Sequence, residues 1–481
     1  MLNIPGVVLL MKNLTTLNMN SKLFNQKISL RSMASLFIGI MAVSSLSLTG
    51  CKSDDDDDDP TTPGNGNQVV EISGDITSNV TWKAAEKYLL KGFVYVKDGA
   101  TVTIEPGTVI KGDKATKGTL IIERGAKIMA EGTAQNPIVF TSNEAKGNRS
   151  YGDWGGIIIC GKAPVNLPGG EGTIEGGVST MYGGTLPNDN SGKLKYLRIE
   201  FPGIAFQPNS EINGLTLGAV GSATEISNIQ VSYCGDDSYE MFGGTVDLKN
   251  VIAFRGWDDD FDTDLGYQGR VQYAVALRDP AIADASGSNG FESDNDGAGT
   301  TATPITRPIF SNVSIFGPLE TSGTSINSQF KRAAHLRRNT RTSTYNSVFA
   351  GYPTGLLLDG NASESNAAAG TLVFRHNIIS GCTTPLSTAS GSSFDLQAWF
   401  DTPGWGNSII SDNSNLKCGY PFTLTSPNFL PQSGSPLLSG ADFTHPDLQG
   451  GFFDNVTYRG AFGSTDWTLG WANFDPQNTD Y

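Results

Sequence analysis

Hydrophobic and polar positions alternate in short runs along most of the chain, and turn-forming pairs separate the runs. Residues 94–110 alternate apolar and polar side chains, interrupted by an Asp-Gly and a Pro-Gly pair, and residues 120–132 repeat this texture. Strict alternation over a few residues indicates a strand with one buried face. The pattern therefore predicts many short strands joined by tight turns, with these two segments among the first of them.

A phrase of similar composition then recurs about every 22 residues. Asn228, Asn250 and Gln272 hold the same place in three successive copies, and looser copies follow. Such a period is typical of one turn of a three-sided parallel β-helix, with a short strand on each side. Amide side chains at one register can stack as a ladder and satisfy bent backbone. We therefore predict an all-β fold: a right-handed parallel β-helix, a three-sided solenoid with caps at both ends.

The ends of such a solenoid need covers, because strand edges and core would otherwise be exposed. Residues 82–90 are expected to form a short helix or loop over the first coil. We place the β-helix at residues 69–440 and an aromatic-rich C-terminal cap at residues 441–481, and we favour this cap over a sugar-stacking platform. The aromatic residues of the C-terminal third are Phe394, Trp399, Phe400, Trp405, Phe452, Phe453, Trp467, Trp471 and Phe474.

The N-terminal segment has a different character. Residues 1–50 combine basic residues with an apolar run at 36–48 that is short for a membrane span, as in a secretory signal. The run ends in Leu-Thr-Gly-Cys, which resembles the lipobox of bacterial lipoproteins and implies a lipid on Cys51. Residues 51–68 carry six adjacent aspartates and form an acidic, flexible tether. The alternatives are an ordinary signal with a chance cysteine and a plain spacer.

The acidic block after Cys51 resembles the export signal of Bacteroidetes surface lipoproteins. The resemblance implies an outer-membrane protein that is lipid-anchored, exposed at the cell surface, and in contact with the membrane through its anchor only. Two longer phrases, YGDWGGIIICGKAPVN and YRGAFGSTDWTLGWANFDP, resemble an envelope β-helix family of pectin-lyase-like fold, and the likeness runs from about residue 70 to 476. This resemblance implies a fold and a location, but no established reaction.

Charge and cysteine content narrow the candidate partners. The net charge is −15, and loss of a signal with four basic and no acidic residues makes it about −19. Nucleic acid is therefore not an expected partner.

Besides Cys51 there are four cysteines: Cys160, Cys234, Cys382 and Cys418. An envelope protein can form disulfides, and Cys382 with Cys418 is the expected pair, whereas the other two are expected to be buried thiols.

The acidic residues gather when consecutive coils are aligned. Glu240, Asp262 and Glu292 fall in one column beside a column of aromatic residues. Coils lie about 4.8 Å apart, so stacked carboxylates repel unless a cation lies between them. Calcium takes roughly six to eight oxygen ligands and is the candidate cofactor; solvated acids at turns are the alternative. The candidate metal ligands are Asp237, Glu240, Asp259, Asp262, Asp264, Glu292 and Asp294.

A basic cluster follows the acidic coils and permits two interpretations. Its arginines either neutralise the acids through ion pairs or bind a ligand. The candidate ligand-binding residues are Arg337, Arg338 and Arg341, and Lys331 and Arg332 lie near them in the sequence.

Our leading expectation is a non-catalytic surface protein that binds an extracellular ligand, most plausibly a polysaccharide, within a nutrient-uptake system. The first alternative is an enzyme. A calcium-dependent polysaccharide lyase would use a Lys or Arg as base, and a glycosidase would use paired carboxylates such as Asp236/Asp237 or Asp259/Asp260. The second alternative is an adhesin or structural envelope scaffold. No catalytic residue can be assigned from the sequence.

Overall fold

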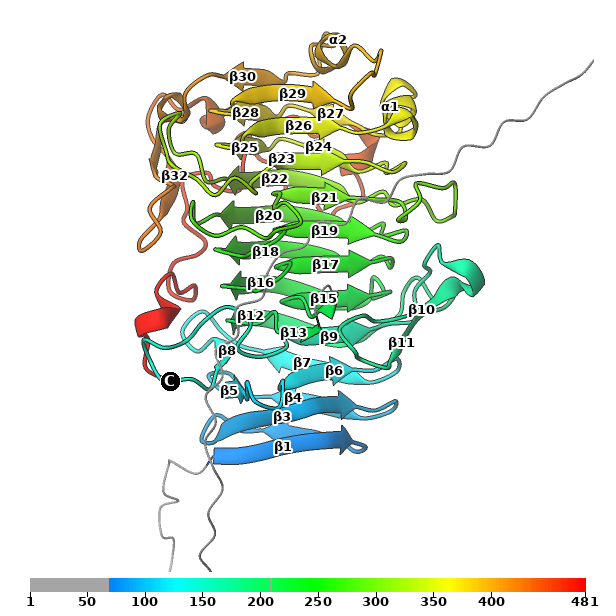
Figure 1. Cartoon of the computed structure of the whole chain (residues 1–481), viewed down its shortest axis with the longest axis vertical. Coiled ribbons are helices and arrows are strands. Elements are labelled where there is room, and N and C mark those ends of the chain that lie inside the picture. Colours follow the sequence, from blue (N-terminus) through cyan, green and yellow to red (C-terminus); the bar gives the residue numbers. More distant parts are fainter. Residues whose placement is uncertain (1–68, 208–209) are drawn as a thin grey trace, which may run out of the picture. The chain divides into compact units, whose positions relative to one another are not determined.

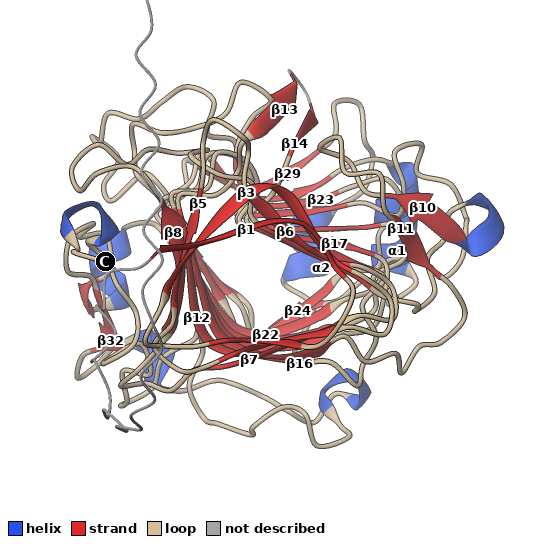
Figure 2. Ribbon diagram, turned by 90° about the horizontal axis from the view of Figure 1, so that it is seen from below, coloured by secondary structure: helices blue, strands red, loops and turns tan. Residues whose placement is uncertain are grey.

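The computed structural model describes residues 69–207 and 210–481, which form a right-handed parallel β-helix with three sheets (Figures 1 and 2). The expected fold class is confirmed. The signal at 1–50, Cys51 and the tether at 51–68 lie outside the described residues. In the described part of the chain, no helix is long and apolar enough to cross a membrane.

The first sheet carries the candidate site and faces the viewer in Figure 1. Each of its strands pairs in parallel with the equivalent strand one coil further along. Its strands are β1 (Val69–Ile76), β3 (Lys87–Val96), β6 (Thr119–Ile122), β9 (Ile157–Cys160), β15 (Leu215–Gly218), β17 (Tyr239–Phe242), β19 (Phe261–Asp264), β21 (Phe291–Ser293), β23 (Arg332–Leu336), β26 (Thr354–Leu358) and β29 (Thr384–Thr388).

The other two sheets share five long strands that bend from the third sheet into the second: β12 (Gly192–Glu200), β16 (Glu225–Ser232), β18 (Asp247–Phe254), β20 (Arg270–Leu277) and β22 (Ile309–Phe316). The second sheet also contains the first halves of β1 and β3, then β5 (Val109–Gly112), β8 (Ile138–Ser142), β25 (Val348–Ala350), β28 (Ile378–Ser380) and β30 (Ser408–Ile410). The third sheet also contains β2 (Val80–Trp82), β4 (Thr101–Ile104), β7 (Lys127–Glu131), β24 (Ser343–Tyr345) and β27 (Phe374–Arg375).

Short elements project from the solenoid. The antiparallel pairs are β10 (Glu171–Thr173) with β11 (Met181–Gly183), β13 (Ala205–Gln207) with β14 (Ser210–Glu211), and β31 (Cys418–Tyr420) with β32 (Asn428–Pro431). The α-helices of the described residues are α1 (Asn361–Ala368) and α2 (Leu396–Phe400).

The bend between the third and second sheets explains the recurring asparagines. Asn228 and Asn250 lie at this bend with φ of 56° and 58°, a left-handed conformation that asparagine tolerates better than most residues. The next coil has one more residue, so Tyr273 (φ 62°) lies at the bend and Gln272 pairs in register with Lys249. The predicted register is therefore right for the two asparagines and wrong by one residue for Gln272. No hydrogen bond joins the side chains of Asn228 and Asn250 in the described part of the chain, so the predicted amide ladder is not seen there.

The interior of the solenoid is filled with apolar side chains. Tyr239, Phe261 and Phe291 stack on successive coils, with ring centroids 5.2 and 5.7 Å apart, and none is more than 1 % exposed. This is the predicted aromatic column. Because successive side chains of a strand point to opposite faces, the residue after each of these rings points out of the first sheet, and in all three strands that residue is acidic.

The two ends of the solenoid are built differently from the expectation. Residues 82–90 contain the end of β2 and the start of β3 rather than a helix, because their apolar side chains pack into the core. At the other end, α2 places Leu396, Trp399 and Phe400 against the last coils. The aromatic cover therefore comes from residues before 441.

Residues 441–481, the C-terminal segment, run along the flank where the second and third sheets meet instead of crossing the last coil (Figure 1). Backbone N–H groups of the segment donate to the side-chain oxygens of Gln272 and Gln230, each over 2.8 Å. Further down, the hydroxyl of Tyr481 donates to Oε1 of the buried Glu200 over 2.6 Å. Outward-facing amides of the solenoid hold this segment in place.

The expected disulfide is not formed. All four cysteines of the described residues are free thiols, and Cys160 and Cys234 are buried as predicted. Cys382 packs against the core of the solenoid, whereas Cys418 begins β31 and packs against the cluster under the C-terminal segment. The two residues belong to different layers of the molecule, which explains why the pairing prediction is wrong.

Candidate ligand-binding groove and acidic ladder

A ladder of acidic side chains crosses β17, β19 and β21 on the outer face of the first sheet. Glu240 pairs in register with Asp262, and Asp262 with Glu292, so the predicted column is present. The column continues to Thr216 in β15 and His335 in β23. We call the acidic residues of this column and of the column described next the acidic ladder.

The turns before these strands carry a second column. The backbone N–H of Asp237 donates to Asn213 Oδ1 (3.2 Å), that of Asp259 to Asp237 Oδ1 (2.8 Å), and that of Asn289 to Asp259 Oδ1 (2.5 Å). Each side chain thus links its own coil to the next. Asp237 and Asp259 are 8 % and 4 % exposed, because the neighbouring coils cover them on both sides.

Burial and mutual repulsion change the protonation of the ladder. Burial, followed by the charge of neighbouring carboxylates, raises the pKa of Asp237, Glu240, Asp259 and Asp262 well above the usual range. The charged form of each is disfavoured because water is excluded and like charges lie one coil away. Either protonation or a bound cation would relieve this repulsion.

The opposite end of the ladder is neutralised by basic groups. Arg337 forms ion pairs with Glu292 and, over 2.7 Å, with Asp294, and Arg338 pairs with Asp294 over 2.7 Å. Nδ1 of His335 lies 3.2 Å from Glu292 Oε1. Burial alone would raise the pKa of Glu292, but the hydrogen bond from His335 and the charge of Arg337 outweigh it and lower this pKa.

The remaining predicted site residues lie close to this end or outside it. Asp264 Oδ1 accepts a hydrogen bond from its neighbour Leu265 over 2.6 Å, and burial raises the pKa of Asp264 to about 7. Arg341 donates to Asn366 Oδ1 over 3.3 Å and makes no contact with the ladder among the described residues. Of the expected ligand-binding arginines, the structure therefore brings two to the ladder and leaves Arg341 apart.

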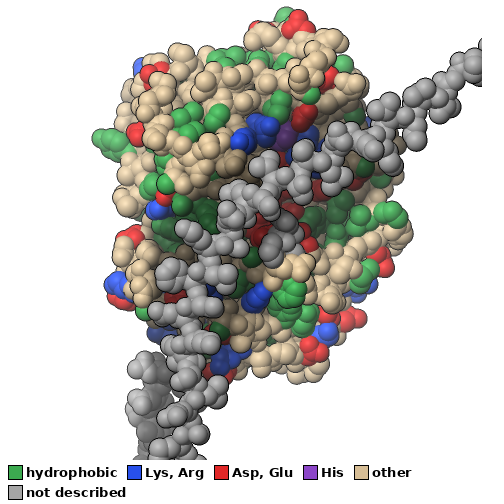
Figure 3. All heavy atoms as spheres, viewed as in Figure 1, with side chains coloured by type: hydrophobic (Ala, Val, Ile, Leu, Met, Phe, Trp, Pro, Cys, Tyr) green, Lys and Arg blue, Asp and Glu red, His purple; other side chains and the backbone are tan. Residues whose placement is uncertain are grey.

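Beside the ladder lies an open groove of about 850 Å³, the acidic groove. Figure 3 shows acidic side chains gathered in the middle of this face. Among the described residues that line the groove, none is Lys or Arg. Its carboxylates are Glu175, Glu211, Asp236, Asp237, Glu240, Asp258 and Asp284.

An aromatic pair forms one wall of the acidic groove. The rings of Tyr151 and Trp257 stack with centroids 5.7 Å apart and planes 11° apart, and Trp257 is 39 % exposed. The carbonyl oxygen of Trp257 accepts hydrogen bonds from Arg278 Nη2 (2.8 Å) and Ser288 Oγ (2.6 Å). Arg278 is itself fixed by a buried ion pair with Asp260 over 2.8 Å. The backbone at Trp257 is therefore fixed, and its indole packs on Tyr151 while it stays partly exposed to solvent.

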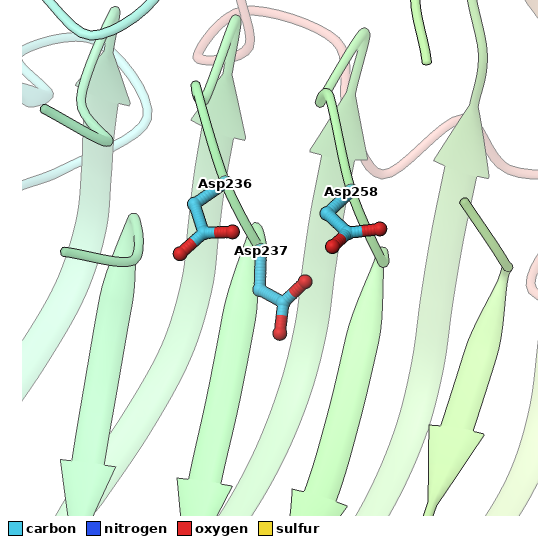
Figure 4. A group of neighbouring side chains, drawn as sticks. All are labelled: Asp236, Asp237 and Asp258. Atoms are coloured by element: carbon cyan, nitrogen blue, oxygen red, sulfur yellow. The ribbon is translucent and has the colours of Figure 1, made fainter. Parts of the chain in front are cut away.

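The two carboxylate pairs considered for glycosidase chemistry separate in the structure. Asp236 and Asp237 line the acidic groove, and the carboxylates of Asp236, Asp237 and Asp258 point toward one another (Figure 4). Asp260 is fully buried against Arg278, and Asp259 is enclosed in the ladder. Only the first pair can reach a ligand in the groove.

Sequence reasoning missed several residues of the groove. Glu175 and Glu211 belong to insertions between coils, where the 22-residue register gives no guidance. The position of Trp257 directly before three aspartates was the available signal. A lone aromatic residue beside an acidic turn is a weak signal, and only the folded chain brings Tyr151 to it.

Several groups of carboxylates can hold a cation. Oxygen atoms within 4.8 Å of one another are supplied by Asp237, Glu240 and Asp262, and likewise by Asp259, Asp262 and Glu292. The buried atom Asp262 Oδ1 has no hydrogen-bond partner, and the same holds for Oδ1 of Asn289 beside it. All ligand atoms that these groups offer to a metal are carboxylate oxygens, the ligand type that a hard cation such as Ca²⁺ prefers. The ladder residues therefore fit calcium, with Glu292 already engaged by Arg337.

Comparison with known proteins is consistent with this architecture. A family model described as a pectate-lyase-like β-helix domain matches residues 74–405. Among solved structures, pectate lyase Pel9A is similar at 13 % identity, covering 77 % of this chain and 89 % of its own, with a TM-score of 0.38. The Dettilon tailspike protein gp208 is similar at 10 % identity, covering 67 % and 62 %, with a TM-score of 0.22. No curated protein matches the sequence. The chain belongs to the family of pectate-lyase-like β-helix domains.

Proposed function

We propose that the protein binds a polysaccharide in the acidic groove. The observation that carries the proposal is an open groove of about 850 Å³ that combines an exposed indole, stacked on Tyr151, with a dense set of carboxylates. Sugar rings stack their apolar faces on aromatic side chains, and carboxylates accept hydrogen bonds from sugar hydroxyls. A volume of about 850 Å³ exceeds that of a single sugar ring and can hold several sugar units.

Calcium is the proposed cofactor of the ladder, with Asp237, Glu240, Asp259 and Asp262 as its ligands. The bound ion would neutralise carboxylates that otherwise repel one another. Asp264, Glu292 and Asp294 are weaker candidates, because arginines or backbone groups already satisfy them. In this proposal the ion shapes the wall of the groove and takes no part in a reaction.

Location is a separate proposal, which rests on sequence resemblance. We propose that Cys51 carries the lipid and that the tether at 51–68 presents the β-helix at the outer surface of the outer membrane, where it serves a nutrient-uptake system. The test is incorporation of an alkyne-labelled fatty acid together with protease accessibility in intact cells. Loss of label in Cys51→Ser supports the anchor, and label retained in that variant contradicts it.

A glycoside hydrolase is the second candidate function. Carboxylate oxygens of Asp236, Asp237 and Asp258 lie within 4.8 Å of one another in the groove, and burial raises the pKa of Asp258 to about 6. A proton donor beside an ionised carboxylate is the arrangement that a glycosidase needs. A lyase is less favoured, because the groove has no Lys or Arg lining to serve as base.

The proposal is tested by measuring affinity for a polysaccharide panel in affinity gels, with wild-type protein, Trp257→Ala and Tyr420→Ala. Tyr420 is 71 % exposed and lies in β31, outside the groove, so it is a matched control. We expect Trp257→Ala to weaken binding about tenfold, the equivalent of ~1.4 kcal/mol for a lost stacking contact. Unchanged binding by Trp257→Ala would refute the groove as the site. Product analysis on the same panel distinguishes binding from hydrolysis.

A further inference from the structure

Three carboxylates that line the groove lie close together: Asp236, Asp237 and Asp258, here called the acidic triad (Figure 4). One oxygen from each lies within 4.8 Å of the other two. Asp237 is 8 % exposed, and one of its oxygens accepts the backbone N–H of Asp259. Its other oxygen takes part in no hydrogen bond among the described residues, and Asp237 lines the groove. Asp258 also lines the groove, and its Oδ1 is buried without a hydrogen-bond partner. A buried carboxylate with a free oxygen at a cavity wall indicates a missing positively charged or hydrogen-bonding partner.

The spacing of the triad suits an alkylammonium group. Such a group has three N–H donors in tetrahedral directions. Acceptors at roughly 2.8 Å from the nitrogen would then lie about 4.6 Å apart. This agrees with the triad, whose three oxygens lie within 4.8 Å of one another. Calcium needs roughly six to eight oxygens, of which the triad offers few, and the ladder supplies a more enclosed site for it.

The charge of the groove points in the same direction. Seven carboxylates line it, and one Ca²⁺ would neutralise only two of them. A polyuronate would add one negative charge per sugar to a wall without Lys or Arg, which is unfavourable at these distances. The groove is therefore matched to a positively charged ligand.

The aromatic wall completes the match. Trp257 lines the same groove as the triad, and its exposed indole can carry the apolar face of a sugar ring or attract an ammonium group. We propose that the acidic groove selects saccharides with free amino groups, with the ammonium in the triad and a sugar ring on Trp257. This inference rests on the proposed polysaccharide-binding function and names its ligand class.

The test is calorimetric titration of the full chain with three hexasaccharides: glucosamine, N-acetylglucosamine and galacturonate oligomers. Each is measured in EDTA and in calcium. We expect the glucosamine oligomer to bind at least tenfold more tightly than either of the others, and Asp236→Asn and Asp258→Asn each to remove most of this preference. Both substitutions keep the side-chain shape, and circular dichroism checks that the variants are folded.

Glu225→Gln is the matched control, because it removes the same charge on the third sheet, where Glu225 pairs with Lys193 over 3.1 Å. If this variant loses affinity as Asp236→Asn does, the attraction is general and the triad is not a site. Tighter binding of the galacturonate oligomer in calcium would overturn the amino-sugar inference and leave polysaccharide binding intact. If no member of the polysaccharide panel or of these oligomers binds, the proposed function itself fails.

Discussion

Replacing Asp262 by Asn should have opposite effects with and without calcium. Asp262 faces carboxylates on both neighbouring coils, with oxygens within 4.8 Å. Two ionised carboxylates at this separation would repel by about 3.5 kcal/mol at an effective dielectric constant of about 20 and by about 0.9 kcal/mol in water. The raised pKa of Asp262 means that proton uptake relieves part of this repulsion, and that uptake itself costs stability at neutral pH, where the unfolded chain is ionised. Because Asp262 is partly exposed and Arg337 already compensates Glu292, we expect Asp262→Asn to stabilise the calcium-free protein by ~1–2 kcal/mol at neutral pH.

Calcium should reverse the order of stability of the wild type and the Asp262→Asn variant. Binding with a Kd of about 1 mM, common for extracellular sites, stabilises the wild type by ~1.4 kcal/mol in about 10 mM calcium. For a domain of this size that corresponds to a rise in Tm of roughly 1.5–2 °C. Asp262→Asn removes a central ligand, so its Tm should not respond to calcium.

The assay is differential scanning calorimetry at pH 7 in EDTA and in calcium, with Asp247→Asn as control. Asp247 pairs with Arg270 on the third sheet, so its removal should lower Tm in both buffers and leave the calcium response intact. An Asp262→Asn variant with the wild-type calcium response would exclude this residue as a ligand. A loss of stability in EDTA would show that repulsion does not dominate the ladder.

Three further outcomes follow from buried polar groups. Arg278→Met removes the partner of the fully buried Asp260 and should cost roughly 3–5 kcal/mol in urea unfolding; a loss below 1 kcal/mol would contradict the burial of the pair. The pKa of Asp264 is raised to about 7 by burial, so the native state keeps a proton that the unfolded chain releases near pH 4. Stability in EDTA should therefore decrease as pH rises from about 4 to 7, and an equally steep decrease in Asp264→Asn would refute the assignment. Tyr481→Phe leaves a buried oxygen of Glu200 without its donor and should cost about 1–3 kcal/mol, measured by Tm.

The fold and the ladder could be predicted because both repeat with the coil. The 22-residue period places Glu240 and Asp262 at one position of successive strands, and the aromatic-acidic pair Phe291-Glu292 marks the same position after a longer coil. Alternation then puts the acidic residues on the outer face while the aromatic column turns inward. The same argument misplaced Gln272, because one coil has an extra residue and a register argument cannot detect where it is inserted.

The groove could not be predicted from the repeat. Glu175 and Glu211 come from insertions whose path depends on tertiary packing. The solenoid period likewise says nothing of the C-terminal segment, which follows the flank because Gln230 and Gln272 offer outward amides to its backbone. A disulfide between Cys382 and Cys418 was inferred from composition and compartment alone. Neither of these says how far apart the two cysteines lie in the folded chain.

The C-terminal segment alters how the molecule can come apart. In a plain solenoid each coil contacts only its neighbours, so the end coils can fray one at a time. Here the hydroxyl of Tyr481 is hydrogen-bonded to Glu200, 281 positions earlier, and Lys146 forms an ion pair with Asp480. Coils near the start of the solenoid are thereby tied to chain that leaves its last coils, and separating them requires the segment to detach first. We therefore expect the coils that the segment spans to unfold together rather than one at a time.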